Sequence, residues 1–251
     1  MASDLIEIFS AIQGEGPIVG RRQIFLRFGH CDVACSYCDT PLCHVELASF
    51  RAETAPGSRA FDSNPNPASE DLIVELVERL DSPKGRHHSV SLTGGEPLLH
   101  AQTISAIGPR LQARGLKMYL ETNGHLVDEL EVALPAIDII GMDIKIESTT
   151  GFAARHDDNL AFLAKAKEAE AEVFVKIVVG TDTTHDELEA AFDVVRDVDS
   201  ELSVVLQPVT PFAGRGEPPA PSALLAMHDT ALATLPNALV IPQTHKMIKQ
   251  K

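Results

Sequence analysis

Short apolar runs alternate along this chain with longer segments in which apolar residues recur every three or four positions. The short runs predict strands at 23–28, 89–92, 117–120, 137–142, 173–179, 202–206 and 239–241. The periodic segments predict helices at 69–80, 103–114, 152–171, 184–198 and 222–235. Strands that alternate with helices pair in parallel through right-handed crossovers. We therefore expect an α/β fold, either a full or a partial (β/α) TIM-type barrel.

The stretch 51–68 breaks this alternation. It contains Pro56, Gly57, Pro65 and Pro67 but few large apolar residues. Such a composition is typical of turns and predicts a surface insertion. The chain has 251 residues, of which 44% are hydrophobic, and this is enough for one large core. We therefore expect a single domain over residues 1–251 that carries an insertion at 51–68.

The net charge of the chain limits the kinds of partner that it can bind. The formal net charge is −15 at pH 7, so most of the surface would repel a phosphate-rich partner. No segment approaches the run of about 18 apolar residues that spans a bilayer. The first residues, Met1 to Asp4, lack the basic and apolar regions of a secretory signal. We expect a cytoplasmic protein that binds neither nucleic acid nor membranes.

All four cysteines lie in one short stretch, which indicates metal or redox chemistry rather than a disulfide framework. Cys31, Cys35 and Cys38 have the spacing C-x3-C-x2-C. Three thiolates on a short loop can hold three irons of a four-iron cluster and leave the fourth iron open. The alternative is a zinc site closed by Cys43 or His44. The paired C-x2-C pattern of many zinc sites is absent, so we expect Cys43 to be a bystander.

Polar clusters follow several of the predicted strands. They are Thr93-Gly94-Gly95-Glu96-Pro97, Glu121-Thr122-Asn123-Gly124, Asp143 and Gln207-Pro208. The carboxyl ends of barrel strands carry the active site, which favours a functional reading of these clusters. Each cluster could equally be an ordinary turn or helix cap. Two adjacent glycines would allow the backbone to approach a ligand closely.

The cysteine triad and the glycine pair together resemble the radical S-adenosylmethionine (SAM) superfamily. Tyr37, just before the third cysteine, matches its pattern, as does the Gly-Gly-Glu-Pro stretch sixty residues later. The resemblance implies a [4Fe–4S] cluster on Cys31, Cys35 and Cys38 whose open iron binds SAM. Cleavage of SAM would then release a 5′-deoxyadenosyl radical. Glu96 would meet the amino group of SAM.

Further segments resemble the 7-carboxy-7-deazaguanine synthase family within that superfamily. They are Ile8-Phe9, Gln13-Gly14-Glu15-Gly16, Gly20-Arg21, Phe25-Leu26-Arg27-Phe28, Gln207-Pro208 and Gln243-Thr244-His245-Lys246. The resemblance covers nearly the whole chain apart from 51–68. It implies a lyase of queuosine and 7-deazapurine biosynthesis. Such an enzyme converts 6-carboxy-5,6,7,8-tetrahydropterin to 7-carboxy-7-deazaguanine with loss of ammonia.

The same resemblance assigns roles to individual residues. It implies that SAM contacts Tyr37, Cys38, Asp39, Gly95, Glu96, Asp143, Lys145 and Gln207. It implies that the pterin contacts Ile12, Gln13, Gly14, Arg27, Thr93 and the terminal carboxylate of Lys251. Thr40 would bind Mg2+ through its hydroxyl, and the guanidinium of Arg27 suits the substrate carboxylate. A homodimer and an electron donor such as a flavodoxin or ferredoxin are also implied.

The stretch Asp143-Ile144-Lys145 departs from this family, in which many members have Ser-Pro-Lys. An Asp-x-Lys sequence also occurs in radical activating enzymes. A glycyl-radical enzyme activase is therefore the main alternative function, although it would not explain 13–16 or 243–246. A non-catalytic zinc-binding module is a further alternative and would explain the cysteines alone.

Overall fold

The computed structural model describes residues 2–250. The strands are β1 (Ala2–Ser3), β2 (Leu5–Ile12), β3 (Arg22–Phe28), β4 (Ser49–Glu53), β5 (Phe61–Pro65), β6 (Ala68–Ser69), β7 (Ser89–Gly94), β8 (Lys117–Thr122), β9 (Ile139–Ile144), β10 (Glu172–Val179), β11 (Ser203–Pro208) and β12 (Ala238–Val240). The α-helices are α1 (Glu70–Leu80), α2 (Ala101–Gln112), α3 (Val127–Ala133), α4 (Glu147–Thr150), α5 (His156–Lys167), α6 (His185–Val198), α7 (Pro221–Leu232) and α8 (Thr244–Met247). Short 3-10 helices are η1 (Pro41–His44), η2 (Pro97–His100) and η3 (Leu134–Ala136).

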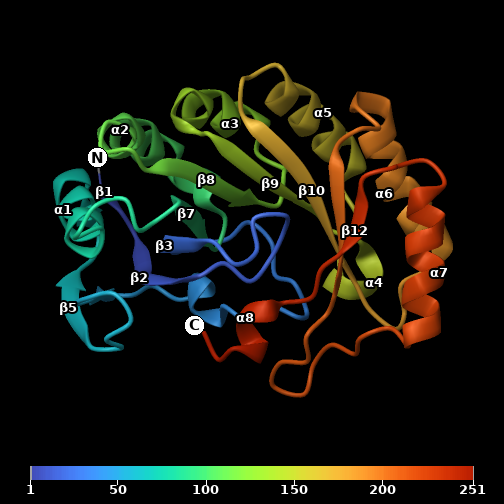
Figure 1. Ribbon diagram of the computed structural model, residues 1–251, viewed down its shortest axis with the longest axis horizontal. Coiled ribbons are helices and arrows are strands. Elements are labelled where there is room, and N and C mark those ends of the chain that lie inside the picture. Colours follow the sequence, from blue (N-terminus) through green and yellow to red (C-terminus); the bar gives the residue numbers. More distant parts are fainter. Residues whose placement is uncertain (1, 251) are drawn as a thin grey trace.

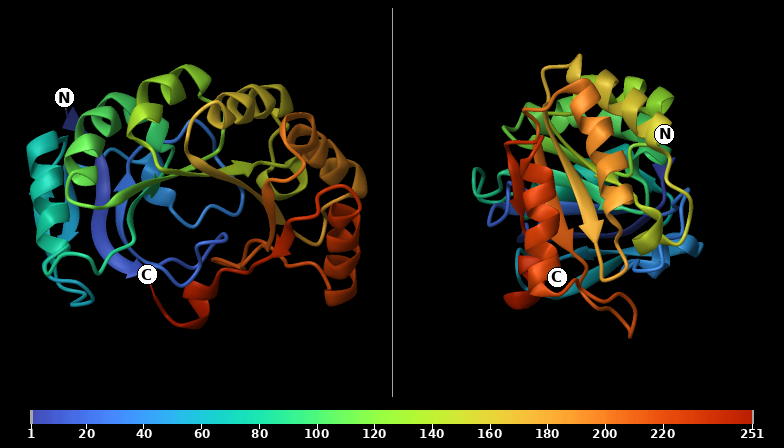
Figure 2. Two further views of the ribbon diagram at one scale, coloured as in Figure 1. Left: turned by 45° about the horizontal axis from the view of Figure 1, so that its top comes forward. Right: turned by 90° about the vertical axis from the view of Figure 1, so that its right-hand side faces the viewer.

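A ten-stranded sheet organises the fold, with the order β12-β11-β10-β9-β8-β7-β3-β2-β4-β5. The strands from β3 through β7 to β12 are parallel, whereas β2 runs antiparallel to β3. Figure 2 (left) shows that the sheet curves strongly, with the large helices on its convex side. Within the described residues β12 and β5 are the two ends of this sheet. The structure is therefore the partial form of the expected barrel.

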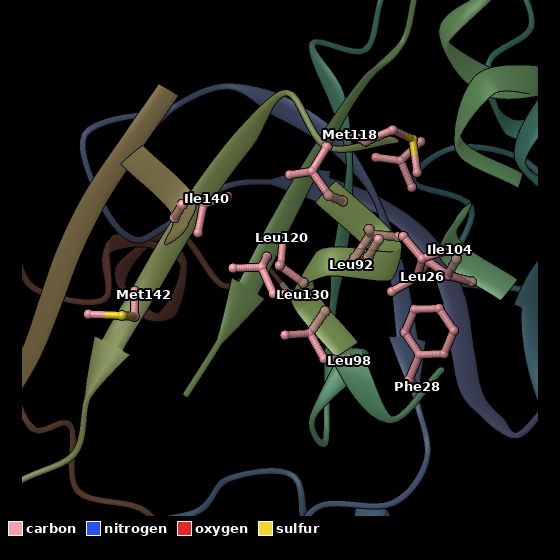
Figure 3. Close-up of a cluster of buried hydrophobic side chains, with 14 of the residues drawn as sticks. Leu26, Phe28, Leu92, Leu98, Ile104, Met118, Leu120, Leu130, Ile140 and Met142 are labelled. Carbon is pink, nitrogen blue, oxygen red and sulfur yellow. The ribbon is translucent and has the colours of Figure 1, made fainter. Parts of the chain in front are cut away.

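The hydrophobic core lies between the convex face of the sheet and the helices. Leu26, Leu92, Leu120 and Ile140 are paired in register across four neighbouring strands, and all four are fully buried. Figure 3 shows this row close to Leu98, Ile104 and Leu130, which come from η2, α2 and α3. Successive side chains of a strand point to opposite faces. The residues next to the leucine row, among them Arg27, Thr93 and Glu121, therefore face the concave side.

The predicted elements are present with shifted ends, and several further elements were not predicted. The helix predicted at 152–171 is α5, which spans only 156–167 and is preceded by the separate short helix α4. The N-terminal strand β2 was missed because Leu5 to Ala11 are all buried and show no alternation of polar and apolar residues. The short helices α3 and α4 were missed as well. Among residues 2–250 no helix is long and apolar enough to cross a membrane.

Most residues of the stretch 51–68 are exposed, and the stretch contains strands rather than turns alone. It holds part of β4, all of β5 and the first residue of β6, and β4 pairs in parallel with β2. Ala52 and Glu53 are buried, whereas most of β5 is exposed at the edge of the sheet. Pro65 lies at the end of that edge strand, where a missing N–H costs no sheet hydrogen bond. Local composition could not reveal the pairing with a strand forty residues earlier.

A buried hydrogen-bonded relay fixes the end of α1 to the sheet. The Oγ of Ser10 lies 2.9 Å from Nε2 of His87, and Nδ1 of His87 lies 3.0 Å from Oδ1 of Asp81. All three residues are buried. Burial lowers the pKa of His87, so its ring is neutral and can accept from Ser10 while donating to Asp81. The relay thus gives hydrogen-bond partners to three polar side chains that would otherwise be buried without them.

We expect His87→Ala to lower the free energy of unfolding by about 2–4 kcal/mol, because it leaves the buried Asp81 carboxylate without its partner. Urea denaturation followed by circular dichroism measures this change. His185→Ala is the control, since that side chain is 66% exposed and should change stability by less than about 0.5 kcal/mol. Equal stability of the two variants would contradict a structural role for the relay.

Candidate active site

A cavity of about 550 Å³ lies on the concave side of the sheet. This volume is typical of a site for small molecules, which ranges over roughly 300–1,000 Å³. Its wall combines the loop after β3, the carboxyl ends of β7, β8 and β9, and the inner face of β10. The segment 243–246, which contains the start of α8 (red in Figure 1), completes the wall. Residues from both ends of the chain therefore meet in one space.

The cysteine loop forms one end of this cavity. Cys31, Cys35 and Cys38 all line it and are partly exposed, whereas Cys43 in η1 is buried. The thiol of Cys43 is hydrogen-bonded to both Cys31 and Cys38. The hydrogen bond from Cys43 lowers the pKa of Cys38 to about 6, against the opposing effect of burial. The pKa of Cys31 is lowered in the same way, whereas burial raises the pKa of Cys35. Cys31 and Cys38 are therefore the thiols that most readily become the thiolates that iron ligation requires.

The glycine pair after β7 allows this loop to pack closely against it. A Cβ on Gly95 would overlap the carbonyl oxygen of His30, and Gly94 has a φ of +114°. The backbone N–H of Glu96 donates to the carbonyl of His30 at 2.9 Å, and that of Gly95 donates to Phe28 at 3.1 Å. Only glycine fits both requirements at these positions. The two motifs separated by sixty residues are thus one structural unit.

Glu96 joins the cysteine loop to the end of β8. It is buried, and it accepts hydrogen bonds from Thr122 Oγ1 at 2.8 Å and from the backbone N–H of Asn123 at 2.9 Å. The side chain of Asn123 donates in turn to Asp32 at 2.7 Å. Burial raises the pKa of Glu96 to about 7, although these hydrogen bonds lower it. A cationic group bound beside it would hold the carboxylate in its charged form.

A second polar cluster lies deeper in the curve of the sheet. Nε2 of Gln13 donates to Gln23 at 2.9 Å and to Glu121 at 3.1 Å. Glu121 also accepts from Ser91 at 2.6 Å. Burial and the nearby charge of Glu15 raise the pKa of Glu121. This cluster offers several hydrogen-bond acceptors in a space shielded from water.

Arg27 stands between the two polar clusters. Its Nη1 donates to Thr40 Oγ1 at 3.0 Å, and its Nε donates to Glu7 at 3.2 Å. Lys246 forms a 2.9 Å ion pair with Asp39, which adjoins Thr40. The α8 segment is therefore tied to the cysteine loop through Lys246. A Cβ on Gly14 would overlap the ring of His245, so glycine is required where the same segment crosses 13–16.

An ion chain runs along the cavity wall. Nζ of Lys176 on β10 lies 2.6 Å from Glu15 and 3.1 Å from Oδ2 of Asp143. Lys145 also contacts Oδ2 of Asp143, at 2.9 Å, and it donates to the hydroxyl of Tyr37 at 2.9 Å. Buried charges that alternate in sign compensate one another in a medium of low polarity. The chain connects the cysteine loop to 13–16.

All the residues to which the sequence assigned a role, apart from Lys251, line this one cavity. They are Ile12, Gln13, Gly14, Arg27, Cys31, Cys35, Tyr37, Cys38, Asp39, Thr40, Thr93, Gly95, Glu96, Asp143, Lys145 and Gln207. Lys251 lies outside the described residues, so the prediction for its carboxylate stays a prediction. The individual roles of the residues that do line the cavity also stay predictions.

Several residues of the wall were given no role from the sequence. They include Glu15, Cys43, Glu121, Lys176, Gln243, His245 and Lys246. Lys176 was detectable in principle, because it is the one charged residue in the apolar run 173–179. A charged residue in a buried strand usually has a partner. Glu15 and Asp143, its partners, are distant in sequence and could not be identified.

Comparisons with known proteins agree with this geometry. The model of the Radical SAM superfamily matches residues 26–195. A 7-carboxy-7-deazaguanine synthase from Geobacter sulfurreducens is 40% identical over 249 residues, covering 99% of this chain and 98% of the relative. One from Archaeoglobus fulgidus is 31% identical over 255 residues, covering 99% of both chains. Both relatives therefore match this chain from end to end.

Solved structures share the fold at lower sequence identity. The crystal structure of QueE from Escherichia coli has a TM-score of 0.62 and 20% identity, with 98% of this chain and 95% of the other covered. Streptococcus suis SuiB bound to S-adenosylmethionine has a TM-score of 0.57 and 12% identity, with 87% and 51% covered.

The chain belongs to the radical SAM superfamily, since the superfamily model matches more than half of its length. Membership implies a [4Fe–4S] cluster and SAM as cofactors. Within the superfamily, the chain belongs to the 7-carboxy-7-deazaguanine synthase family. The zinc-binding module and the activase were alternatives from the cysteines and Asp143-x-Lys145, and the full-length relatives favour neither.

The residues present fit both implied cofactors. Three thiols border one end of the cavity, as a site-differentiated cluster requires. In the wall of the same cavity, Oδ1 of Asp143 and Oε1 of Gln207 are buried and have no hydrogen-bond partner among the described residues. Buried acceptors without partners are rare and costly, so they point to a ligand with donor groups. The amino group and ribose hydroxyls of SAM are such donors.

The pKa of Glu96 predicts a pH dependence of stability in the cofactor-free protein. The folded chain binds this proton more tightly than the unfolded chain, whose carboxyl has a pKa near 4.5. The stability that protonated Glu96 contributes to the folded chain is therefore fully present below about pH 4.5. This stability is lost as the pH rises through about 7. When the pH rises from 5 to 8, the free energy of unfolding of the wild type should fall by about 2–3 kcal/mol more than that of Glu96→Gln.

Urea unfolding at the two pH values measures this difference. Glu201→Gln is the matched control, because Glu201 is exposed. It should follow the wild type at both pH values. Identical pH slopes for Glu96→Gln and the wild type would rule out the raised pKa.

Proposed function

We propose that this chain converts 6-carboxy-5,6,7,8-tetrahydropterin to 7-carboxy-7-deazaguanine, with loss of ammonia. The observation that carries the proposal is a single cavity that combines two chemically different ends. The cysteine loop lies at one end, and the acceptor-rich cluster around Gln13 and Glu121 lies deeper in the curve of the sheet. Arg27 stands between them. A cofactor and a small polar heterocycle can therefore meet inside it.

When bound, the cluster and SAM would supply the radical chemistry that removes a hydrogen atom from the pterin. The protein's part is to bind, orient and exclude water. Cys31, Cys35 and Cys38 hold the cluster, and Glu96 accepts from the amino group of SAM. The unpartnered oxygens of Asp143 and Gln207 accept further hydrogen bonds from SAM.

The pterin occupies the inner cluster with its guanidine-like edge toward Glu121. The carboxylate of Glu121 accepts hydrogen bonds from that edge, whereas an oxygen in the same place would have no hydrogen to donate to it. The guanidinium of Arg27 pairs with the substrate carboxylate in a bidentate manner. Ile12, Gly14 and Thr93 complete this wall, and the terminal carboxylate of Lys251 is a further acceptor for the pterin.

Magnesium would bind at Thr40, close to Arg27 and Asp39. The hydroxyl of Thr40 already accepts from Arg27 at 3.0 Å and lies 3.3 Å from an oxygen of Asp39. Mg2+ commonly takes few protein oxygens and completes its octahedron with substrate and water. The remaining features of the proposal are a reductant such as a flavodoxin or ferredoxin, a homodimer, and a cytoplasmic location.

The decisive experiment is anaerobic reconstitution with iron and sulfide, followed by incubation with SAM, a reductant, Mg2+ and the pterin. We expect 7-carboxy-7-deazaguanine and ammonia as products. Cys31→Ala, Cys35→Ala and Cys38→Ala should each lose the cluster's visible absorbance and SAM cleavage. Cys43→Ala should keep both, because we propose that Cys43 is not a ligand. A functional cluster without any product from the pterin would refute the proposed activity, and a radical installed on a partner protein would favour the activase.

Thr40→Ala tests the magnesium site. The variant should keep its cluster but lose most of the stimulation by Mg2+, since it lacks the hydroxyl ligand. Thr40→Ser restores the hydroxyl and is the matched control. A magnesium titration of the initial rate measures the effect. An unchanged titration curve for Thr40→Ala would show that the hydroxyl only supports the turn after the cysteine loop.

A further inference from the structure

Lys176 is a buried cation for which the proposed chemistry has given no role. It lies in the middle of β10, where Phe174, Lys176 and Val178 all face the cavity. The other residues of the run 173–179 are apolar. A buried charge costs several kcal/mol of desolvation energy, and an apolar residue of similar size usually serves stability as well. A reason other than stability is therefore needed for a lysine here.

The contacts of Lys176 lead in two directions. Toward the N-terminal loop, Nζ lies 2.6 Å from Oε2 of Glu15, whose Oε1 accepts from Gln243 at 2.7 Å. Toward the cysteine loop, Nζ lies 3.1 Å from Oδ2 of Asp143, which Lys145 also contacts. Lys176 thus bridges Glu15 and Asp143. Glu15 belongs to the loop beside the polar cluster proposed to bind the pterin, and Asp143 is proposed to contact SAM.

Both sides of this bridge are charged at neutral pH. Although burial opposes ionisation, the charge of Lys176 lowers the pKa of Glu15 to about 2. The carboxylates of Asp143 and Glu15 raise the pKa of Lys176, again against burial. The bridge therefore persists through the pH range in which the enzyme would work.

The bridge joins two loop segments to a strand of the sheet. Glu15 belongs to the loop between β2 and β3, and Gln243 belongs to the segment before α8. Lys176 is instead held within a strand that is paired on both sides, with β9 and with β11. A residue in a doubly paired strand is a fixed reference for loops that contact it.

We propose that Lys176 is a positioning residue that sets the pterin end of the cavity in register with the SAM end. It acts through Glu15 on one side and Asp143 on the other. The inference rests on the proposed function, because hydrogen transfer between two bound molecules depends on their relative placement. A displacement of about 1 Å can lower the rate of such a step on the order of 10²-fold.

Lys176→Met tests the proposal, because methionine keeps the length of the side chain and removes the charge. We expect normal cluster absorbance, and SAM cleavage without pterin should be retained, because Lys145 still holds Asp143 at the SAM end in this variant. With pterin, product formation should fall by about 10- to 100-fold, and the ratio of 5′-deoxyadenosine to product should rise above the wild-type value. The KM for pterin should rise, while the KM for SAM should change little.

A second readout uses the cofactor-free protein. Hydrogen exchange of the backbone amides of residues 13–16 and 243–246 should be faster in Lys176→Met, because 13–16 loses a direct ion pair and 243–246 is held to that pair through Glu15. Exchange in α5 should be unchanged. This measurement tests the bridge even if the wild type makes no product from the pterin, an outcome that would refute the proposed function instead.

Two variants complete the design. Lys176→Arg keeps the charge and can contact both carboxylates, so it should recover much of the wild-type product ratio. Lys165→Met is the matched control, since Lys165 lies on α5 and forms a 2.6 Å surface ion pair with Glu131 of α3. It should behave like the wild type. If Lys176→Met does not fold, Glu15→Gln breaks the same bridge and should raise the same ratio.

A wild-type product ratio together with a wild-type KM for pterin in Lys176→Met would overturn the proposal. A proportional loss of cluster, SAM cleavage and product would also overturn it, since that pattern indicates a purely structural role. Failure of Lys176→Arg to recover any of the product ratio would argue against the charge as the cause.

Discussion

The alternation of side chains along the parallel strands is the constraint on which the rest of the structure depends. The row of Leu26, Leu92, Leu120 and Ile140 is in register and buried against the helices. Because neighbouring positions must face the other way, Arg27, Thr93 and Glu121 line the cavity. A shift of register by one residue would exchange these two rows and place Arg27 and Glu121 in the apolar core. The energy of the core therefore also fixes the geometry of the site.

Much of the fold and of the site could be predicted from the sequence, because both depend on local patterns. The strands after which the cysteine loop and Gly94-Gly95 follow are short apolar runs, and the cavity does lie at their carboxyl ends. The strands in 51–68 could not be predicted, because β2, the strand with which β4 pairs, is distant in sequence. The same limit applies to Lys176, whose residue type was visible while Glu15, 161 positions away, was not. Pairings over such separations come from the tertiary structure alone.

The cysteine loop and the glycine pair show how two motifs become one site. Gly95 leaves room for the carbonyl of His30, so the loop can start directly beside the end of β7. Glu96 then reaches the end of β8 and, through Asn123, returns to Asp32 in the cysteine loop. Each contact uses a backbone group or a short side chain, which leaves little freedom of movement. Such rigidity suits a site that must hold a reactive species away from other groups.

The polar interior raises the question of how a curved sheet can carry so much charge on its inner face. In the ion chain the signs alternate from Lys145 through Asp143 and Lys176 to Glu15, so no member is left without a partner of opposite charge. Glu121 lies beside the chain, and burial together with the nearby charge of Glu15 raises its pKa. Replacement of the chain by apolar residues could keep the sheet folded, but it would remove the links between loops. The network is therefore better explained by the placement of ligands than by the stability of the fold.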